Sequence, residues 1–178
     1  MSEGLIFSTA PLERPLEFAG PIKAKLFVSS STDDMDLFAT LRAFDPGGKE
    51  VTFFSAVEPK APVSQGWLRV SQRKLDPKRS TEWQPWHTHD EAQKLKPGQI
   101  VEVDLEIWPG SALLPAGYHL ALTLQGKDFE RPGEGPQRGS GWFLHDDPRD
   151  RPPASFGGAH TVYSGGGRES HLLLPELP

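Results

Sequence analysis

The sequence contains no cysteine among its 178 residues. A disulfide framework, a cysteine nucleophile and a thiolate metal site are therefore excluded, and we expect a reducing, cytoplasmic location. Positive charge is also scarce, because 19 Lys and Arg stand against 24 Asp and Glu and most of them are scattered along the chain. Since proteins that bind a nucleic-acid backbone need a basic face to release counterions, we expect no nucleic-acid partner.

Long apolar runs are missing as well. No stretch approaches the roughly 20 apolar residues of a membrane-spanning helix, and the start of the chain lacks the basic and then apolar segments of a signal peptide. We therefore expect no membrane partner. The nucleophile elbow Gly-x-Ser-x-Gly is also absent. Ser64 and Ser155 have the second glycine but a proline in place of the first, so we expect no catalytic residue in this chain.

Glycine and proline are abundant, with 18 residues of each and no repeat period. This composition is typical of many short strands joined by tight turns. Apolar and polar residues alternate with the period of two that marks a half-buried strand. The clearest case is Val101–Ile107, where Glu102, Asp104 and Glu106 should lie on the wet face. The same alternation predicts strands at Ile22–Val28, Leu37–Ala43 and Tyr118–Leu124, and a turn at Asp45–Gly48 followed by a strand at Val51–Val57.

Weaker signals complete the expected fold. They predict strands at Leu5–Ser8, Leu16–Phe18, Trp67–Ser71, His160–Tyr163 and His171–Leu174. The one expected helix is a turn or two near Asp90–Lys94. About nine or ten short strands without crossover helices cannot form a parallel sheet. The sequence therefore predicts an all-β fold, an antiparallel β-sandwich of the jelly-roll type, as a single domain over residues 1–178.

The segment His87-Thr88-His89 has the spacing of a metal-ligand pair, because side chains two positions apart on a strand point the same way. In cupins, which are metal-binding jelly rolls, a glutamate and a distant histidine complete such a site. Glu91 and His119 are the candidates here. Glu91 follows the pair too closely, however, and His87 lies among Pro and Trp. We therefore expect neither a metal nor another cofactor, and a cupin-like metalloprotein is the alternative.

Acidic residues gather at Asp33–Asp36 and, beside a histidine, at His145–Asp147. Neither segment has the spacing of a calcium-binding loop. We interpret the first as a turn that leads into a strand, and the second as structural or interfacial.

Two segments, Gln72–Gly98 and Gly126–Ala159, are too long for simple connections, and both contain tryptophan. Loops beyond about 15 residues are uncommon in compact domains and are often functional or interfacial. Three interpretations of these tryptophans are open. They close the ends of the sandwich, they anchor a protein partner, or they form a platform for a carbohydrate. Under the partner hypothesis the interface candidates are Arg69, Arg73, Trp83, Trp86, His87, Trp142, His145, Asp146 and Asp147.

Several motifs, in a fixed order, resemble the C-terminal domain of X-Pro dipeptidyl-peptidases and of cocaine-esterase-like (CocE/NonD) hydrolases. Gly66–Asp76 resembles their G-W-L-R-x-S-x-R segment, and Val101–Pro109 resembles their V-x-V-x-[LI]-x-I-W-P strand. Ser170–Pro175 is similar to their terminal S-H-L-x-L-P. Further matches lie at Thr9–Leu12, Gly20–Ile22, Leu95–Gly98 and Pro115–Tyr118, so the resemblance covers essentially the whole chain.

The resemblance implies a galactose-binding-like jelly roll that is not catalytic. In this family it packs against an α/β-hydrolase domain with a Ser-His-Asp triad and against a helical cap. The expected role is to stabilise that catalytic domain and to shape the active-site entrance of an acyl esterase, amino-acid ester hydrolase or X-Pro peptidase. The expected partners are the catalytic domain and the cap, and the isolated chain should self-associate at its docking face to form a homo-oligomer. A free-standing carbohydrate-binding module is the alternative from another class.

Overall fold

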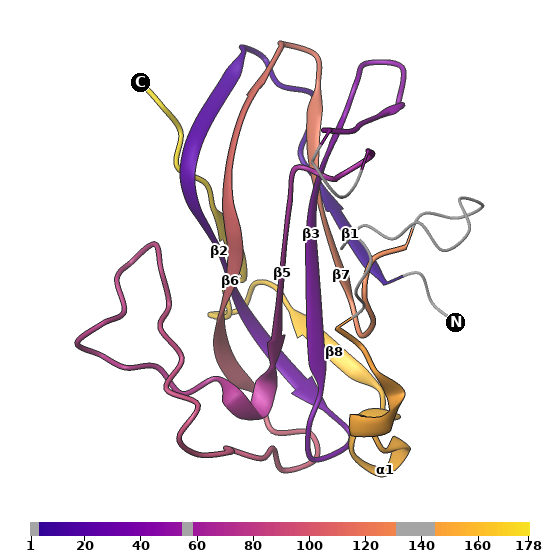
Figure 1. Ribbon diagram of the computed structural model, residues 1–178, viewed down its shortest axis with the longest axis vertical. Helices are drawn as coiled ribbons and strands as arrows, with labels where there is room; N and C mark the ends of the chain where they lie inside the picture. The colour runs from indigo at the N-terminus through magenta and orange to yellow at the C-terminus, as the bar shows by residue number, and fades with distance from the viewer. Residues whose placement is uncertain (1–3, 55–58, 131–144) are drawn as a thin grey trace.

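The computed structural model describes residues 4–54, 59–130 and 145–178. Within these residues, nine strands form two antiparallel sheets that pack face to face, as Figure 1 shows. Helical structure is confined to α1 (Pro153–Phe156) and to the 3₁₀ turns η1 (Val70–Gln72) and η2 (Pro148–Asp150). The architecture is an antiparallel β-sandwich, which confirms the predicted fold class.

Each sheet is built around one long central strand. The first sheet has the order β1 (Leu5–Ser8), β7 (His119–Gln125), β3 (Asp36–Phe44) and β4 (Glu50–Val51), and β5 (Ser64–Arg69) also pairs with β3. The second sheet consists of β6 (Val101–Leu114), β2 (Leu16–Ser30), β8 (His160–Tyr163) and β9 (His171–Leu173). Both β8 and β9 pair with β2, so they follow one another along the same edge of that strand.

The core lies between the sheets and follows the predicted alternation. On β6, Leu105 and Ile107 are fully buried, and their register partners on β2 are Ala24 and Ile22. Val101, at the start of the strand, is only half-buried. On the outer face the charges pair across strands: Lys23 Nζ lies 3.3 Å from an oxygen of Asp104, and Lys25 Nζ lies 2.6 Å from an oxygen of Glu102. The hydrogen bond that Lys25 donates to Glu102 raises the pKa of Lys25.

The predicted helix at Asp90–Lys94 is wrong. The backbone N–H of Gln93 donates to the carbonyl of Ser71 at 2.7 Å, and the N–H of Leu95 donates to the carbonyl of Asp33 at 2.8 Å. Because these donors reach neighbouring segments rather than carbonyls one turn back, no helix forms there. The short helix lies at Pro153–Phe156 instead, with proline in its first turn.

Two predicted strands, Leu16–Phe18 and Ile22–Val28, are parts of a single long strand, β2. A register shift between Gly20 and Ile22 interrupts its pairing with β6, and Gly20 has a φ of 135° that favours glycine. The hairpin after Asp45–Gly48 forms as predicted, but its second strand, β4, ends at Val51. Residues 55–57 of the expected strand lie outside the described residues.

The two lateral edges of the sandwich differ. At one edge β5 and β6 lie side by side and join the sheets (Figure 1). Gly66 packs so closely that a Cβ atom there would lie 2.0 Å from the carbonyl oxygen of Glu106, and Ser64 Oγ donates to the carbonyl of Trp108 at 2.5 Å. At the opposite edge, a cavity of about 490 Å³ separates β1 and β7 from β8 and β9. We call these the closed edge and the open edge.

Candidate interaction surface

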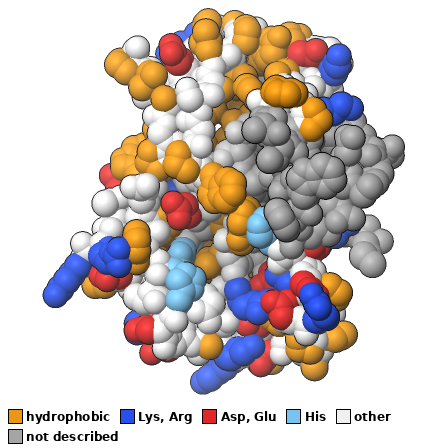
Figure 2. Space-filling model, viewed as in Figure 1, with side chains coloured by type: hydrophobic (Ala, Val, Ile, Leu, Met, Phe, Trp, Pro, Cys, Tyr) orange, Lys and Arg blue, Asp and Glu red, His pale blue; other side chains and the backbone are white. Residues whose placement is uncertain are grey.

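An aromatic cluster of Trp67, Trp108 and His145 lies on the outside of the closed edge. The ring centroids of Trp67 and Trp108 are 5.2 Å apart, and the rings are tilted by 57°. The ring of His145 stacks on Trp67 with a centroid distance of 3.8 Å. Trp108 is 59% exposed. Figure 2 shows hydrophobic side chains at the middle of this face, a histidine beside them and a group of charged side chains below.

Strand alternation places both tryptophans on the outside. On β5, Gly66 and Leu68 are buried, so Trp67 between them points outward. On β6, Ile107 is buried and Trp108 follows it on the exposed side. Both tryptophans lie on β-strands rather than on loops, and the sandwich therefore fixes their positions.

Asp128 holds the third member of the aromatic cluster. Its carboxylate accepts a hydrogen bond of 2.9 Å from the backbone N–H of His145 and lies 3.0 Å from Nδ1 of the same residue. Asp128 is only 2% exposed, and its own N–H donates to Asp146 Oδ2. This buried carboxylate orients the His145 ring on Trp67. No sequence motif marks Asp128, and sequence reasoning missed it.

A charged cluster adjoins the aromatic cluster and is centred on Asp36, at the start of β3. Arg69 donates to both oxygens of Asp36, at 2.9 and 3.1 Å, and Arg151 Nε lies 2.5 Å from Asp36 Oδ2. The hydrogen bonds that Arg69 donates to Asp36 raise the pKa of Arg69. Asp36 is 5% exposed, so the paired geometry compensates the desolvation of its charge.

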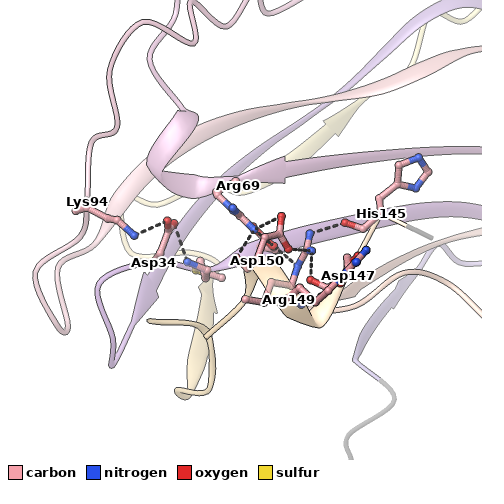
Figure 3. Close-up of polar contacts among 10 residues, drawn as sticks. Asp34, Arg69, Lys94, His145, Asp147, Arg149 and Asp150 are labelled. Carbon is pink, nitrogen blue, oxygen red and sulfur yellow. Dashed lines mark hydrogen bonds and ion pairs between the residues drawn. The ribbon is translucent and has the colours of Figure 1, made fainter. Parts of the chain in front are cut away.

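Arg151 joins the charged cluster to the aromatic cluster. Its guanidinium donates to the carbonyl of His145 and, at 3.0 Å, to that of Asp147. Figure 3 shows the ring of His145 pointing away from the charged residues, while Arg69, Asp150 and Arg149 gather below it. Arg151 thus ties the segment that carries His145 to the carboxylate of Asp36 on β3. The same carboxylate binds Arg69 on β5.

The acidic turn before β3 forms as predicted, and its central residue is buried. Asp34 is 1% exposed, and its carboxylate accepts bonds from the N–H groups of Met35 and Ser71 and from Lys94 Nζ. Asp34 therefore satisfies backbone donors from η1 and its own turn, which is a structural role. Nearby, the ring of Phe156 lies under the guanidinium of Arg69, and the guanidinium carbon is 4.5 Å from the ring centroid.

Arg73, another interface candidate, is half-buried and hydrogen-bonded within its own loop. Its Nη1 donates to the carbonyls of Val70 at 3.1 Å and Gln93 at 2.5 Å, and burial lowers its pKa. Arg73 therefore joins the two ends of the Gln72–Gly98 loop from within. Further out on this loop, Trp83 is 37% exposed and Trp86 is 46% exposed, as an interface requires.

Trp86 carries a cation on its ring, because the guanidinium carbon of Arg79 lies 3.4 Å from the ring centroid. Trp142, the remaining tryptophan among the interface candidates, lies outside the described residues. Asp147 accepts from the N–H of Arg149 and forms an ion pair with its guanidinium. The hydrogen bonds from Arg149 lower the pKa of Asp147 to about 2.

The structure does not bring the histidine pair together with the two other residues that the cupin-like alternative requires. The rings of His87 and His89 are 6.1 Å apart, Glu91 pairs with Lys74, and His119 stacks on Phe44. Within the described ranges, no group of three His, Asp or Glu residues is arranged to hold a metal ion. His87 is half-buried, and its pKa is lowered first by burial and then by the neighbouring His89.

The family model described as the X-Pro dipeptidyl-peptidase C-terminal non-catalytic domain matches residues 1–173. A CocE/NonD family hydrolase from Staphylococcus aureus has a similar structure, with a TM-score of 0.81 and 32% sequence identity over 98% of this chain and 30% of that chain. An alpha-amino acid ester hydrolase, 20% identical with a TM-score of 0.67, shares the fold.

The curated relatives are also much longer than this chain. A Mycobacterium bovis protein named as a candidate serine esterase is 29% identical over 128 residues, and the match spans 70% of this chain and 19% of the relative. A Mycobacterium tuberculosis protein with the same type of name matches to the same extent. Among the described residues there is no helix long and apolar enough to cross a membrane.

Proposed function

Since the chain belongs to the family of X-Pro dipeptidyl-peptidase C-terminal non-catalytic domains, we propose that it serves as the accessory domain of a larger serine hydrolase. It docks on the α/β-hydrolase domain and its cap, stabilises them and shapes one side of the active-site entrance. The parent enzyme cleaves acyl esters, amino-acid esters or X-Pro amides. The observation that carries this proposal is the aromatic cluster, with Trp108 59% exposed on a rigid strand.

The aromatic cluster has the character of a binding anchor. Tryptophan and arginine dominate protein–protein hot spots, and such residues cluster where surrounding contacts exclude water. Trp67 and His145 are already stacked, and Asp128 fixes the histidine ring. Docking therefore costs little side-chain entropy, because the groups that would make contact are ordered beforehand.

The rim beside the aromatic cluster suits the same role. Arg149 is 89% exposed and Asp147 is 42% exposed, so their charges remain accessible to a partner. Exposed rim charges select orientation and speed association more than they add affinity. Trp83 and Trp86 on the Gln72–Gly98 loop extend the surface with further exposed aromatic area. We propose that a domain partner covers all three parts.

A free-standing carbohydrate-binding module is disfavoured by the same contacts. A sugar ring stacks on an open aromatic face, and here Arg79 covers one face of Trp86 while His145 covers one face of Trp67. These contacts leave a sugar only the opposite faces of the two rings, whereas a protein surface can pack around the paired side chains.

The test is one substitution made in two contexts. In the isolated chain, Trp108→Ala should change the free energy of unfolding by less than about 1 kcal/mol, since exposed positions contribute little. In the full-length hydrolase that carries this domain, the same change should lower the stability of domain association by about 2 kcal/mol or more, as for an interface anchor. Ile6→Ala is the control, because Ile6 is 54% exposed but lies on the opposite edge.

Equal effects of Trp108→Ala in both contexts would contradict docking at this surface. A second measurement tests the non-catalytic role directly. The isolated chain should not hydrolyse p-nitrophenyl esters above the background rate, because no activated nucleophile is present in its sequence. Saturable hydrolysis that disappears when one serine is changed would refute that role.

A further inference from the structure

One nitrogen of the His145 ring has no hydrogen-bond partner among the described residues. One face of the ring stacks on Trp67, and Nδ1 lies 3.0 Å from the carboxylate of Asp128. The side chain is 31% exposed, and Figure 3 shows the ring directed away from the charged residues. The second ring nitrogen, Nε2, is therefore a polar atom on the surface proposed to dock that no described residue satisfies.

The buried carboxylate of Asp128 decides which ring nitrogen carries the proton. Asp128 is 2% exposed, and its oxygens accept the backbone N–H of Phe129 at 3.1 Å and that of His145 at 2.9 Å. Since an ionised carboxylate can only accept hydrogen bonds, the proton in its contact with the ring lies on Nδ1. In the neutral ring Nε2 then has a lone pair and accepts a hydrogen bond. Catalytic triads orient histidine in the same way.

Docking adds a requirement at this atom. Under the proposed function a partner surface covers Trp67 and His145 and removes Nε2 from water. An acceptor that is buried without a donor weakens association about 5- to 150-fold. A doubly protonated ring would instead bring a charge into the covered surface, and the guanidinium of Arg151 already lies on the carbonyl of the same residue. A neutral ring needs only one donor from the partner.

We infer that Nε2 of His145 accepts a hydrogen bond from an uncharged O–H or N–H group of the hydrolase domain. At this point the partner surface carries a donor, such as a serine or threonine hydroxyl or a backbone N–H, and no carboxylate. Asp128 is a positioning residue, because it is buried and acts only through the tautomer and orientation of the ring. This inference rests on the proposed function and adds the polar chemistry of the docking contact to it.

The tautomer is tested first, in the absence of a partner. Nitrogen-15 spectra of the histidine-labelled chain at slightly alkaline pH distinguish a protonated ring nitrogen from one with a lone pair, and His145→Phe assigns the signals. We expect the proton on Nδ1 and a lone pair on Nε2. Asp128→Asn should raise the population of the Nε2–H tautomer, since an amide can also donate to Nδ1. If the tautomer of a folded Asp128→Asn variant is unchanged, Asp128 does not position the ring.

The contact itself is tested in the full-length hydrolase. Resonance energy transfer between dyes on the two domains gives the docking equilibrium constant in mild urea. His145→Phe keeps an aromatic ring beside Trp67 but removes the lone pair, so docking should weaken about tenfold or more. His171→Phe is the matched control, because His171 is exposed on β9 at the open edge. The control should change the constant by less than about twofold.

Nitrogen-15 spectra of the docked enzyme identify the kind of partner group. A hydrogen-bonded Nε2 that carries no proton supports the inference. An Nε2 that carries a proton in the docked enzyme would overturn it, because the partner would then present an acceptor.

Trp108→Ala separates this inference from the proposed function. If Trp108→Ala weakens docking and His145→Phe does not, the domain docks at this surface but His145 accepts no hydrogen bond, and the inference is wrong. If neither variant weakens docking, the proposed function fails as well. Thermal unfolding verifies that each variant is folded. If Asp128→Asn does not fold, His145→Phe and the spectra of the unchanged chain still decide the question.

Discussion

The closed and open edges solve the same packing problem in different ways. At the closed edge, Gly66 brings β5 against the backbone of β6, so the sheets meet without a side chain between them. The large side chains next to this contact, Trp67 and Trp108, therefore lie outside. At the open edge no such contact exists among the described residues, and apolar side chains such as Phe7 remain half exposed. The edge at which the sheets meet therefore presents tryptophan side chains on its outer surface, and the edge at which they stay apart presents partly exposed core side chains.

The largest effect should follow from opening the closed edge. A Cβ at Gly66 would lie 2.0 Å from the carbonyl oxygen of Glu106, and that backbone cannot move without displacing β6. We expect Gly66→Ala to lower the free energy of unfolding by about 4 kcal/mol, above the usual range for overpacking. Gly126→Ala is the control, since nothing lies within 4 Å of its added Cβ. Chemical denaturation measures both, and a cost below about 1 kcal/mol for Gly66→Ala would deny the close approach.

A second comparison concerns leucines of the core. Leu105 is 0% exposed behind the closed edge, whereas Leu122 is 8% exposed and lines the cavity at the open edge. Leu105→Ala should cost about 2–5 kcal/mol, and Leu122→Ala should lie at or below the lower end of that range because its surroundings are already open. Equilibrium urea unfolding of the two variants gives the difference. If Leu122→Ala costs as much as Leu105→Ala, the cavity is filled in solution.

A smaller change in the free energy of unfolding should appear with pH, because of His87 on the Gln72–Gly98 loop. Burial and His89 lower the pKa of His87 below the 6.5 of an unperturbed histidine. The unfolded chain therefore binds a proton at a higher pH than the folded chain, and stability falls as the pH decreases below about 6.5. Thermal unfolding between pH 7.5 and 5 should show this loss, and His87→Gln should reduce it. A pH dependence that is identical in His87→Gln would exclude His87 as its source.

The smallest change in stability is expected at the open edge. Ile6 is 54% exposed on the edge strand β1, so Ile6→Lys should alter the free energy of unfolding by less than about 0.5 kcal/mol. A lysine on an edge strand nevertheless opposes pairing with another chain. The expected result is less self-association at high concentration in analytical ultracentrifugation, with Trp108→Lys for comparison. If only Trp108→Lys disperses the chain, self-association occurs at the closed edge.

Much of the sandwich could be predicted from the sequence because strand alternation is a local signal. Val103, Leu105 and Ile107 are buried as the period of two requires. The cavity at the open edge could not be predicted, because it depends on β8 and β9 sharing one edge of β2, which is a long-range pairing. The predicted helix at Asp90–Lys94 is wrong because backbone N–H groups of this segment donate to carbonyls that are distant in sequence. Helix propensity describes only local interactions, so it could not reveal these hydrogen bonds.

The interface candidates named from the sequence stay a prediction, and the structure shows where the described ones lie. Arg69 and His145 lie in the two adjoining clusters. Arg73, however, points into the base of its loop, and Asp128 was not expected at all. Asp128 and His145 are 17 residues apart in sequence, and a contact at that separation leaves no local pattern to recognise. Residue type alone can suggest an exposed anchor, but it cannot reveal which buried carboxylate orients that anchor.

The close approach at Gly66 also has a mechanical consequence. Two sheets that touch along one edge and diverge at the other can separate only by rotation about the line of contact. The axis of that motion runs along β5 and β6, where Ser64 bonds to Trp108. Displacements therefore grow with distance from this axis and are largest at β1 and β8. Any such rotation would leave Trp67 and Trp108 nearly in place, because points beside an axis of rotation are displaced least.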